Sequence, residues 1–360
     1  MRFIIPLSLF ILLISLLLPL LLISSPEFEE LREEEETPEA VEAAAVAEPP
    51  PLHAPEPQAG QGTLDESIML QVLIGDEVIE LSMAAYLRGV VAAEMPARFH
   101  PEALKAQAVA ARTYTLHRTL IAPTPRHPEA YVCGSYACCK AYHDEARLRE
   151  RWGADYEHYS AIIAQAIAET DGLILVYENQ PILAAFHSSS YGYTEASGAI
   201  WGDVPYLQSV RSHEGPSEVP NYYSTTELSY AEFRQIATNF PGVTLEEGNT
   251  PYWIRHVIYT DSGRLGSIEI GGVTLTGPEF RRLFSLRSTA ITFTFGDTHM
   301  TITTGGYGHG VGMSQFGANT MAELGLGFAA ILDWYYTGVN LISAESLFSQ
   351  GNFFEREQAP

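Results

Sequence analysis

The pattern of hydrophobic and polar positions predicts helices and short strands in mixed order between residues 68 and 336. Alternating positions predict a hairpin over 68–81 that turns at Gly75-Asp76, and a second over 173–187 around Glu178-Asn179. Further short strands are expected within 253–275, 289–295 and 300–304. Helices are expected at 82–93, 101–119, 156–170, 230–239, 278–284, 314–324 and 328–336, with a loop at 212–225. Because this order lacks regular β–α–β alternation, we expect an α+β fold in one mixed domain.

Glu94 stands out in the predicted helical stretch because apolar residues flank it on both sides. Ser82 is suited to cap the first helix, which Met95-Pro96-Ala97 ends, and Pro101 is suited to the first turn of the next. Glu94 is therefore expected at a helix C-terminus, where the helix dipole and the apolar neighbours both favour a protonated carboxyl. Such a group is a candidate general acid, and a solvated glutamate at a helix end is the alternative.

The N-terminal segment predicts a membrane anchor. Residues 3–23 contain only Phe, Ile, Leu, Ser and Pro, and as a helix they would reach roughly 30 Å, about the thickness of a bilayer core. Arg2 precedes them and acidic residues follow, so we expect residues 1–25 to be a transmembrane anchor with the N-terminus in the cytoplasm. The alternative is a cleaved signal peptide, although Ser24-Ser25-Pro26-Glu27 makes a poor cleavage site.

Composition divides the remaining chain into three parts. Residues 26–62 contain eleven Glu and one Arg, then a Pro-rich stretch, and we expect a disordered tether. Residues 63–345 are expected to form the domain, followed by a C-terminal tail over 346–360. The formal net charge of the chain is −24, which makes nucleic acid an unfavourable partner.

All three cysteines fall within seven residues, at Cys133, Cys138 and Cys139. Histidines flank them at His127 and His143, and three thiols with one imidazole suit a closed tetrahedral zinc site. Such a site has no open position for water, so its zinc is expected to be structural. The alternative is a disulfide from Cys133 to Cys138 or Cys139, with one thiol left over.

Two further segments carry polar or glycine-rich patterns. His187, Ser188, Ser189 and Ser190 end a predicted strand, where their side chains can together face a bound polar ligand. A Ser–His nucleophile pair is disfavoured because neighbours on a strand point to opposite faces. The glycine-rich run 305–312 lacks the Lys-Ser/Thr of a phosphate loop, and it makes His309 and Gln315 candidate substrate or supporting residues.

Four other side chains are weaker candidates. Arg112 is suited either to orient a substrate carboxylate or carbonyl, or to pair with a buried acid. Tyr193, Trp201 and Trp253 are suited to stack on the rings of a ligand or to pack in the core.

Three segments together resemble the stage II sporulation protein D family: the AAEMPA run around Glu94, residues 186–202 and residues 306–325. The resemblance spans roughly residues 65 to 340. It implies a membrane-anchored lytic transglycosylase acting on cell-wall glycan, with Glu94 as the catalytic residue. It also implies glycan binding by His187, Ser188 and Ser190, and zinc ligation by His127, Cys133, Cys138 and Cys139. Cys138 stands where that family usually has a histidine, so His143 is an alternative fourth ligand.

The implied chemistry needs one carboxylate. An acid protonates the leaving oxygen of a MurNAc–GlcNAc bond, and the same group then acts as base while the muramyl C6 hydroxyl forms a 1,6-anhydro end. A hydrolase generally needs two carboxylates, for which Asp144, Glu195 and Asp203 are candidates.

The resemblance also implies a cellular setting, namely septal wall remodelling during spore engulfment on peptide-stripped glycan. The implied partners are a peptidoglycan amidase and a membrane protein. The alternative function is a non-catalytic amidase enhancer that binds glycan. A zinc-dependent amidase is disfavoured because it needs an open metal position.

Overall fold

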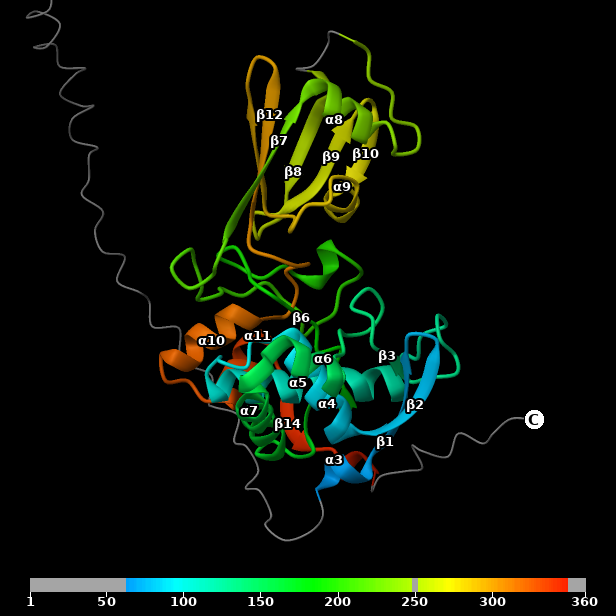
Figure 1. Ribbon diagram of the computed structural model, residues 1–360. Helices are drawn as coiled ribbons and strands as arrows, with labels where there is room; N and C mark the ends of the chain where they lie inside the picture. Colours follow the sequence, from blue (N-terminus) through cyan, green and yellow to red (C-terminus); the bar gives the residue numbers. More distant parts are fainter. Residues whose placement is uncertain (1–62, 248–251, 349–360) are drawn as a thin grey trace, which may run out of the picture. The chain divides into compact units, whose positions relative to one another are not determined.

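The computed structural model describes residues 63–247 and 252–348 (Figure 1). The predicted transmembrane anchor and acidic tether lie outside the described residues. Within the described ranges, no helix combines the length and the apolar character needed to cross a bilayer.

The first elements form as the local sequence predicts. The hairpin pairs β1 (Met69–Ile74) with β2 (Glu77–Ser82), and Gly75 at the turn has a φ of +61°. Ser82 caps α4 (Met83–Glu94) by accepting from the amide of Ala85 at 3.2 Å. Pro101 begins α5 (Pro101–Leu120), whose buried residues run along most of its length.

Two hydrophobic cores lie in the described chain. The main core packs α5 against α4, α7, α10 and α11 and against β4. The insert core is built from residues between 228 and 302, and we call residues 223–305 the insert (Figure 1). The α+β class is thus observed. The expected domain contains two hydrophobic cores, because the strands of the insert bury their own apolar faces against one another.

The remaining elements fall into these two groups. Those of the main core are α3 (Leu64–Ser67), β3 (Val132–Cys133), α6 (Glu145–Trp152), α7 (Tyr156–Ala168), β4 (Leu173–Tyr177), β5 (Gln180–Pro181), β6 (Phe186–His187), β13 (Met313–Ser314), α10 (Gln315–Glu323), α11 (Phe328–Tyr335), β14 (Asn340–Ser343) and α12 (Glu345–Phe348). Those of the insert are β7 (Tyr223–Ser229), α8 (Tyr230–Ala237), β8 (Ile254–Tyr259), β9 (Leu265–Ile270), β10 (Val273–Thr276), α9 (Gly277–Leu283), β11 (Ile291–Phe295) and β12 (His299–Gly305). The insert forms two three-stranded sheets, with strand orders β10-β9-β8 and β11-β12-β7.

Three local expectations need correction. The second hairpin turns at Glu178-Asn179 as predicted, but its return strand is only β5, and β6 pairs in parallel with the distant β13. The other edge of β4 pairs with β14, a strand that the pattern did not predict. The domain also continues past residue 345, since Leu347 of α12 is buried in the main core.

Candidate functional site

Glu94 is the last residue of α4, and its half-buried carboxylate accepts two hydrogen bonds from distant parts of the chain. The backbone amide of Ala141 donates to Oε1 at 3.1 Å, and Nε2 of Gln315 donates to Oε2 at 3.4 Å. Gln315 is the first residue of α10, a helix capped by Ser314. The structure therefore brings together two predicted site residues that are 221 positions apart in the sequence.

A buried cation lies beside this carboxylate. Lys140 Nζ sits over the rings of Phe186 and Tyr114, at 3.4 and 4.3 Å from their centroids. Burial lowers the pKa of Lys140 to about 8, and the charge of Glu94 partly opposes that shift. The sequence analysis did not identify Lys140. The one local indication was that Lys140 directly follows Cys139, a predicted metal ligand.

His187 and His309 form a second part of the site, with ring centroids 5.6 Å apart. The carbonyl of Val311 accepts from Nδ1 of His187 at 3.2 Å, so Nε2 accepts the hydroxyl of Ser190 at 2.7 Å. Burial lowers the pKa of His187 well below its usual value and that of His309 to about 3. Both rings are therefore neutral at neutral pH and act as fixed hydrogen-bonding groups.

The glycine-rich run packs against the segment that carries His187. A side chain at Gly308 would place its Cβ 2.8 Å from Cβ of His187, and one at Gly310 would lie 2.7 Å from Cζ of Arg264. Both glycines have positive φ, at +117° and +88°. The glycines thus allow close approach between 308–312, the His187 segment and an arginine from the insert.

Other predicted substrate residues fall in different environments. Ser188 is half-buried, and its carbonyl accepts from the amide of Phe316, directly after Gln315. Trp201 is 45% exposed with its ring 5.3 Å from that of His309, and Tyr193 is 51% exposed. These two aromatic side chains are accessible to a ligand. Trp253 is instead buried in the insert core.

The substrate role predicted for Arg112 is corrected by the structure. Arg112 is fully buried on α5, where Nε and Nη2 donate to the carboxylate of Asp65, with a shortest distance of 2.5 Å. Nη1 donates to the carbonyl of Leu173 at 2.9 Å. The guanidinium is therefore a packed structural group, which is the alternative that the sequence left open.

Two of the candidate second carboxylates are engaged elsewhere. Glu195 is buried and its Oε2 accepts from Thr260 and Ser262 of the insert, at 2.7 and 2.9 Å. Asp144 caps α6, while Asp203 is exposed. Sequence reasoning missed Glu214, whose buried carboxylate accepts from the amide of Ser190 at 2.6 Å and from the hydroxyl of Ser314.

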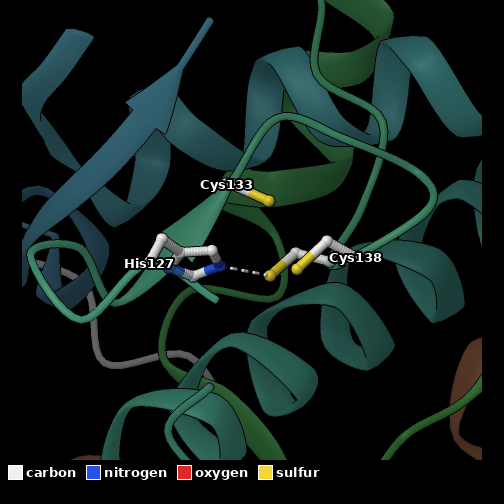
Figure 2. A group of neighbouring side chains, drawn as sticks. His127, Cys133 and Cys138 are labelled. Carbon is white, nitrogen blue, oxygen red and sulfur yellow. Dashed lines mark hydrogen bonds between the residues drawn. The ribbon is translucent and has the colours of Figure 1, made fainter. Parts of the chain in front are cut away.

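The four predicted metal ligands meet in one place (Figure 2). The donor atoms of His127, Cys133, Cys138 and Cys139 all lie within 4.8 Å of one another, and the three cysteines are free thiols. Nδ1 of His127 donates to the carbonyl of Ala130 at 3.0 Å, which leaves Nε2 directed at Sγ of Cys139, 3.4 Å away. A metal-binding histidine is ordinarily oriented by such a second hydrogen bond, so these residues fit a metal site.

The adjacent cysteines reach this group through a tight turn. The amides of Cys138 and Cys139 both donate to the carbonyl of Ser135, at 3.1 and 2.8 Å. His143 is not one of the four donors, and it lines a cavity with Gly89 and Trp152. Of the two candidates for the fourth donor, Cys138 and His143, the geometry therefore favours Cys138.

Comparison with known proteins gives a consistent set of relatives. A family model described as "Stage II sporulation protein" matches residues 75–177. The chain is 39% identical to stage II sporulation protein D of Bacillus amyloliquefaciens, over 76% of this chain and 78% of that protein. It is 36% identical to stage II sporulation protein D of Bacillus subtilis (strain 168), over 79% and 81%. An amidase enhancer of Bacillus subtilis (strain 168) is 28% identical over 71% of this chain and 40% of its own length. The chain belongs to the stage II sporulation protein D family.

Proposed function

We propose that this chain is a peptidoglycan lytic transglycosylase in which Glu94 is the acid and then the base. The observation that carries the proposal is the position of the Glu94 carboxylate, held by Ala141 and Gln315 at the end of α4. It lies within the segment that matches the family model. A glycan strand of the cell wall, peptide-stripped, is the proposed substrate.

The proposed reaction uses this one carboxyl group twice. Protonated Glu94 gives its proton to the oxygen between MurNAc C1 and GlcNAc as that C–O bond breaks. The resulting carboxylate then takes the proton of the muramyl C6 hydroxyl, whose oxygen bonds to C1 and closes the 1,6-anhydro ring. Glu94 ends protonated and no water is consumed. Glu195, one candidate for a second carboxylate, is instead engaged by the hydroxyls of Thr260 and Ser262 of the insert.

The neutral side chains around Glu94 are proposed to hold the strand. The half-buried Ser188 and His309 supply hydrogen-bonding groups, and the exposed ring of Trp201 offers an apolar face to a sugar. His187 and Ser190 are buried and hydrogen-bonded to each other, so they are proposed to hold this segment in place behind the strand. Because both histidine rings stay neutral, they position substrate rather than exchange protons with it. Tyr193 offers a second exposed ring.

We further propose that His127, Cys133, Cys138 and Cys139 hold a structural zinc ion. Zinc would cross-link the loop 127–139 and supply no open coordination position, because the four protein donors complete a tetrahedral set. Of the two residues that follow, Ala141 donates to Glu94 and Lys140 lies over the ring of Phe186, next to His187. The loop is thus proposed to fix these two groups beside Glu94.

The proposed setting is the outer face of the cytoplasmic membrane, with residues 1–25 as a single-pass anchor and the N-terminus inside. In the sporulation setting that the family name indicates, the chain would act on septal wall beside an amidase and a membrane partner. The similarity to an amidase enhancer favours a second candidate, a non-catalytic protein that binds glycan and assists an amidase.

Mass spectrometry of glycan products separates these functions. The full chain in detergent is incubated with glycan strands, with and without stem peptides, beside Glu94→Gln and the exposed control Glu77→Gln. Anhydro products, one water lighter than hydrolytic ones, are expected from the wild type and Glu77→Gln only. Products that contain the added water would identify a hydrolase. Binding without cleavage by the wild type would favour the amidase enhancer.

A further inference from the structure

A cavity of about 540 Å³ lies between α4, α6 and α7, and no residue of the proposed active site lines it. Its volume falls in the range of about 300–1,000 Å³ that is typical of small-molecule sites in proteins. On the α4 side, the small residues Gly89 and Ala92 leave this space open. On the other side, Trp152 ends α6 and Tyr156 begins α7, and both rings line the cavity.

The walls of the cavity are held by packed contacts. A Cβ at Gly89 would overlap the ring of Tyr142 and lie 2.7 Å from the carbonyl oxygen of His143, so only glycine lets this segment lie against α4. The amide of His143 donates to the carbonyl of Gly89 at 3.2 Å. Nη1 of Arg151, from α6, donates to the carbonyl of Ala92 at 3.0 Å. The space between the three helices is therefore formed before a ligand binds.

The charges around the cavity are already compensated. Arg149 pairs with both Glu145 and Glu157, at 2.8 and 3.2 Å. Arg88 pairs with Glu66 at 3.3 Å. Among the described residues, the lining contains no Asp, Glu, Lys or Arg other than Arg88, Glu145 and Glu157. The cavity thus offers no unpaired charge to an ionic ligand.

Neutral polar groups and aromatic faces remain available in the cavity. The indole of Trp152, the hydroxyl of Ser160 and the imidazole of His143 line it and form no hydrogen bonds within residues 63–247 and 252–348. Trp152 and Tyr156 are half-buried, so part of each side chain stays accessible. Aromatic rings beside unpartnered donors and acceptors suit a ligand that has both apolar faces and hydroxyl or amide groups, as a sugar ring does.

The cavity is close in the chain to the candidate catalytic carboxylate along two segments. Ala92 precedes Glu94 by two residues on α4. Ala141, whose amide donates to Glu94, directly precedes the lining residues Tyr142 and His143. The cavity and the carboxylate thus share one helix and one loop.

We propose that this cavity binds an uncharged N-acetylhexosamine unit of the glycan, away from the bond that Glu94 cleaves. This inference rests on the proposed function, because it takes a glycan as the substrate. The absence of unpaired charge favours the neutral GlcNAc unit over a muramyl unit with its carboxylate or peptide. A long strand would occupy the cavity and the Glu94 site together, whereas a short fragment would occupy one of them, so affinity should rise with glycan length.

The test fills the cavity from an exposed position. Ala161 lies on α7, is exposed and lines the cavity, so Ala161→Trp should fill the space without removing a core side chain. Binding of peptide-free glycan of graded length is measured with the full chain in detergent as Glu94→Gln, which leaves the polymer uncut. We expect this parent to bind long strands about tenfold more tightly than tetrasaccharides. Addition of Ala161→Trp should abolish that gain.

Two further sets of variants control this result. Ala146 is exposed on α6 and does not line the cavity, so Ala146→Trp should keep the gain. Trp152→Phe should keep part of the gain and Trp152→Leu should lose it, because a phenyl ring still offers an apolar face. If Ala161→Trp lowers the midpoint of thermal unfolding more than Ala146→Trp does, the two Trp152 variants decide instead.

Three results would overturn the proposal. The first is a gain with length that survives Ala161→Trp, and the second is an equal loss in Ala146→Trp. The third is a gain that free stem peptide abolishes and uncharged chitotetraose does not, because the occupant would then be a peptide.

Cleavage is measured separately with Glu94 intact, so that the two proposals fail differently. If Ala161→Trp removes the gain in binding but no glycan is cleaved by the wild type, the transglycosylase proposal fails and the cavity site stands. If anhydro products form and the KM for long strands is the same with and without Ala161→Trp, the cavity site fails and the transglycosylase proposal stands.

Discussion

The amide of Ala141 donates to the carboxylate of Glu94 at 3.1 Å, and Ala141 lies two residues after Cys139 of the four-donor group. The side chain between them, Lys140, is buried against Phe186. The candidate metal group and the candidate catalytic carboxylate are thus joined by two peptide units. Any change that loosens the cysteine loop is expected to displace a hydrogen-bond donor of Glu94.

Removal of the metal should therefore reduce catalysis as well as stability. We expect a chelator, or Cys133→Ser, to lower the glycan cleavage rate by about 10²-fold, since small displacements of positioning groups have effects of that size. Metal content, cleavage rate and the midpoint of thermal unfolding are measured on the same samples. Restoration of the wild-type rate by added zinc is the control. Full activity in metal-free protein would contradict the proposed role of the loop.

The buried pair of Arg112 and Asp65 should matter for stability and not for chemistry. Removing one member leaves an uncompensated buried charge, so Arg112→Met should cost about 3–5 kcal/mol of unfolding free energy. Denaturant unfolding measures this loss, and Arg88→Met, which breaks an exposed pair with Glu66, is the matched control. The KM of the folded fraction should stay at the wild-type value. A raised KM would instead indicate that Arg112 takes part in substrate binding.

The buried His187 and the half-buried His309 should make stability depend on pH. Folded His187 and His309 stay neutral because burial lowers their pKa values, while the unfolded chain binds protons below about pH 6.5. The contribution of these two histidines to the free energy of unfolding is therefore expected to be fully present above that pH. It should fall as the pH drops from about 6.5 toward about 3. Each histidine contributes a slope of at most about 1.4 kcal/mol per pH unit. Denaturant titrations at pH 7 and pH 5 should show a smaller difference for His187→Gln than for the wild type; an equal difference would argue against this assignment.

Local sequence signals predicted most elements because their causes are local. Ser82 as a cap, Pro101 at a first turn and Glu178-Asn179 at positive φ each act within a few residues. The group of His127 and three cysteines was also predictable, since all four donors lie on one short loop.

The missed features depend on pairing between distant segments. Nothing near β4 indicates that β14 will pair with it, and nothing in the insert sequence indicates a separate core. Lys140 and Glu214 join the site only when β6 and α10 are brought together. Arg112 was ambiguous because its partner Asp65 lies 47 residues away.

Gly310 should be more sensitive to substitution than its backbone conformation alone requires. Gly263 and Gly310 both have positive φ, +75° and +88°, so alanine at either position is strained by roughly 1–2 kcal/mol. A Cβ at Gly263 meets nothing within 4 Å, whereas one at Gly310 lies 2.7 Å from Cζ of the buried Arg264. Gly310→Ala must therefore also displace Arg264 or the run that carries His309. We expect it to lose about 1–3 kcal/mol more than Gly263→Ala in denaturant unfolding, and to lower glycan cleavage, while Gly263→Ala cleaves at the wild-type rate. Equal losses in the two variants would mean that the contact between Arg264 and the glycine-rich run does not hold the site together.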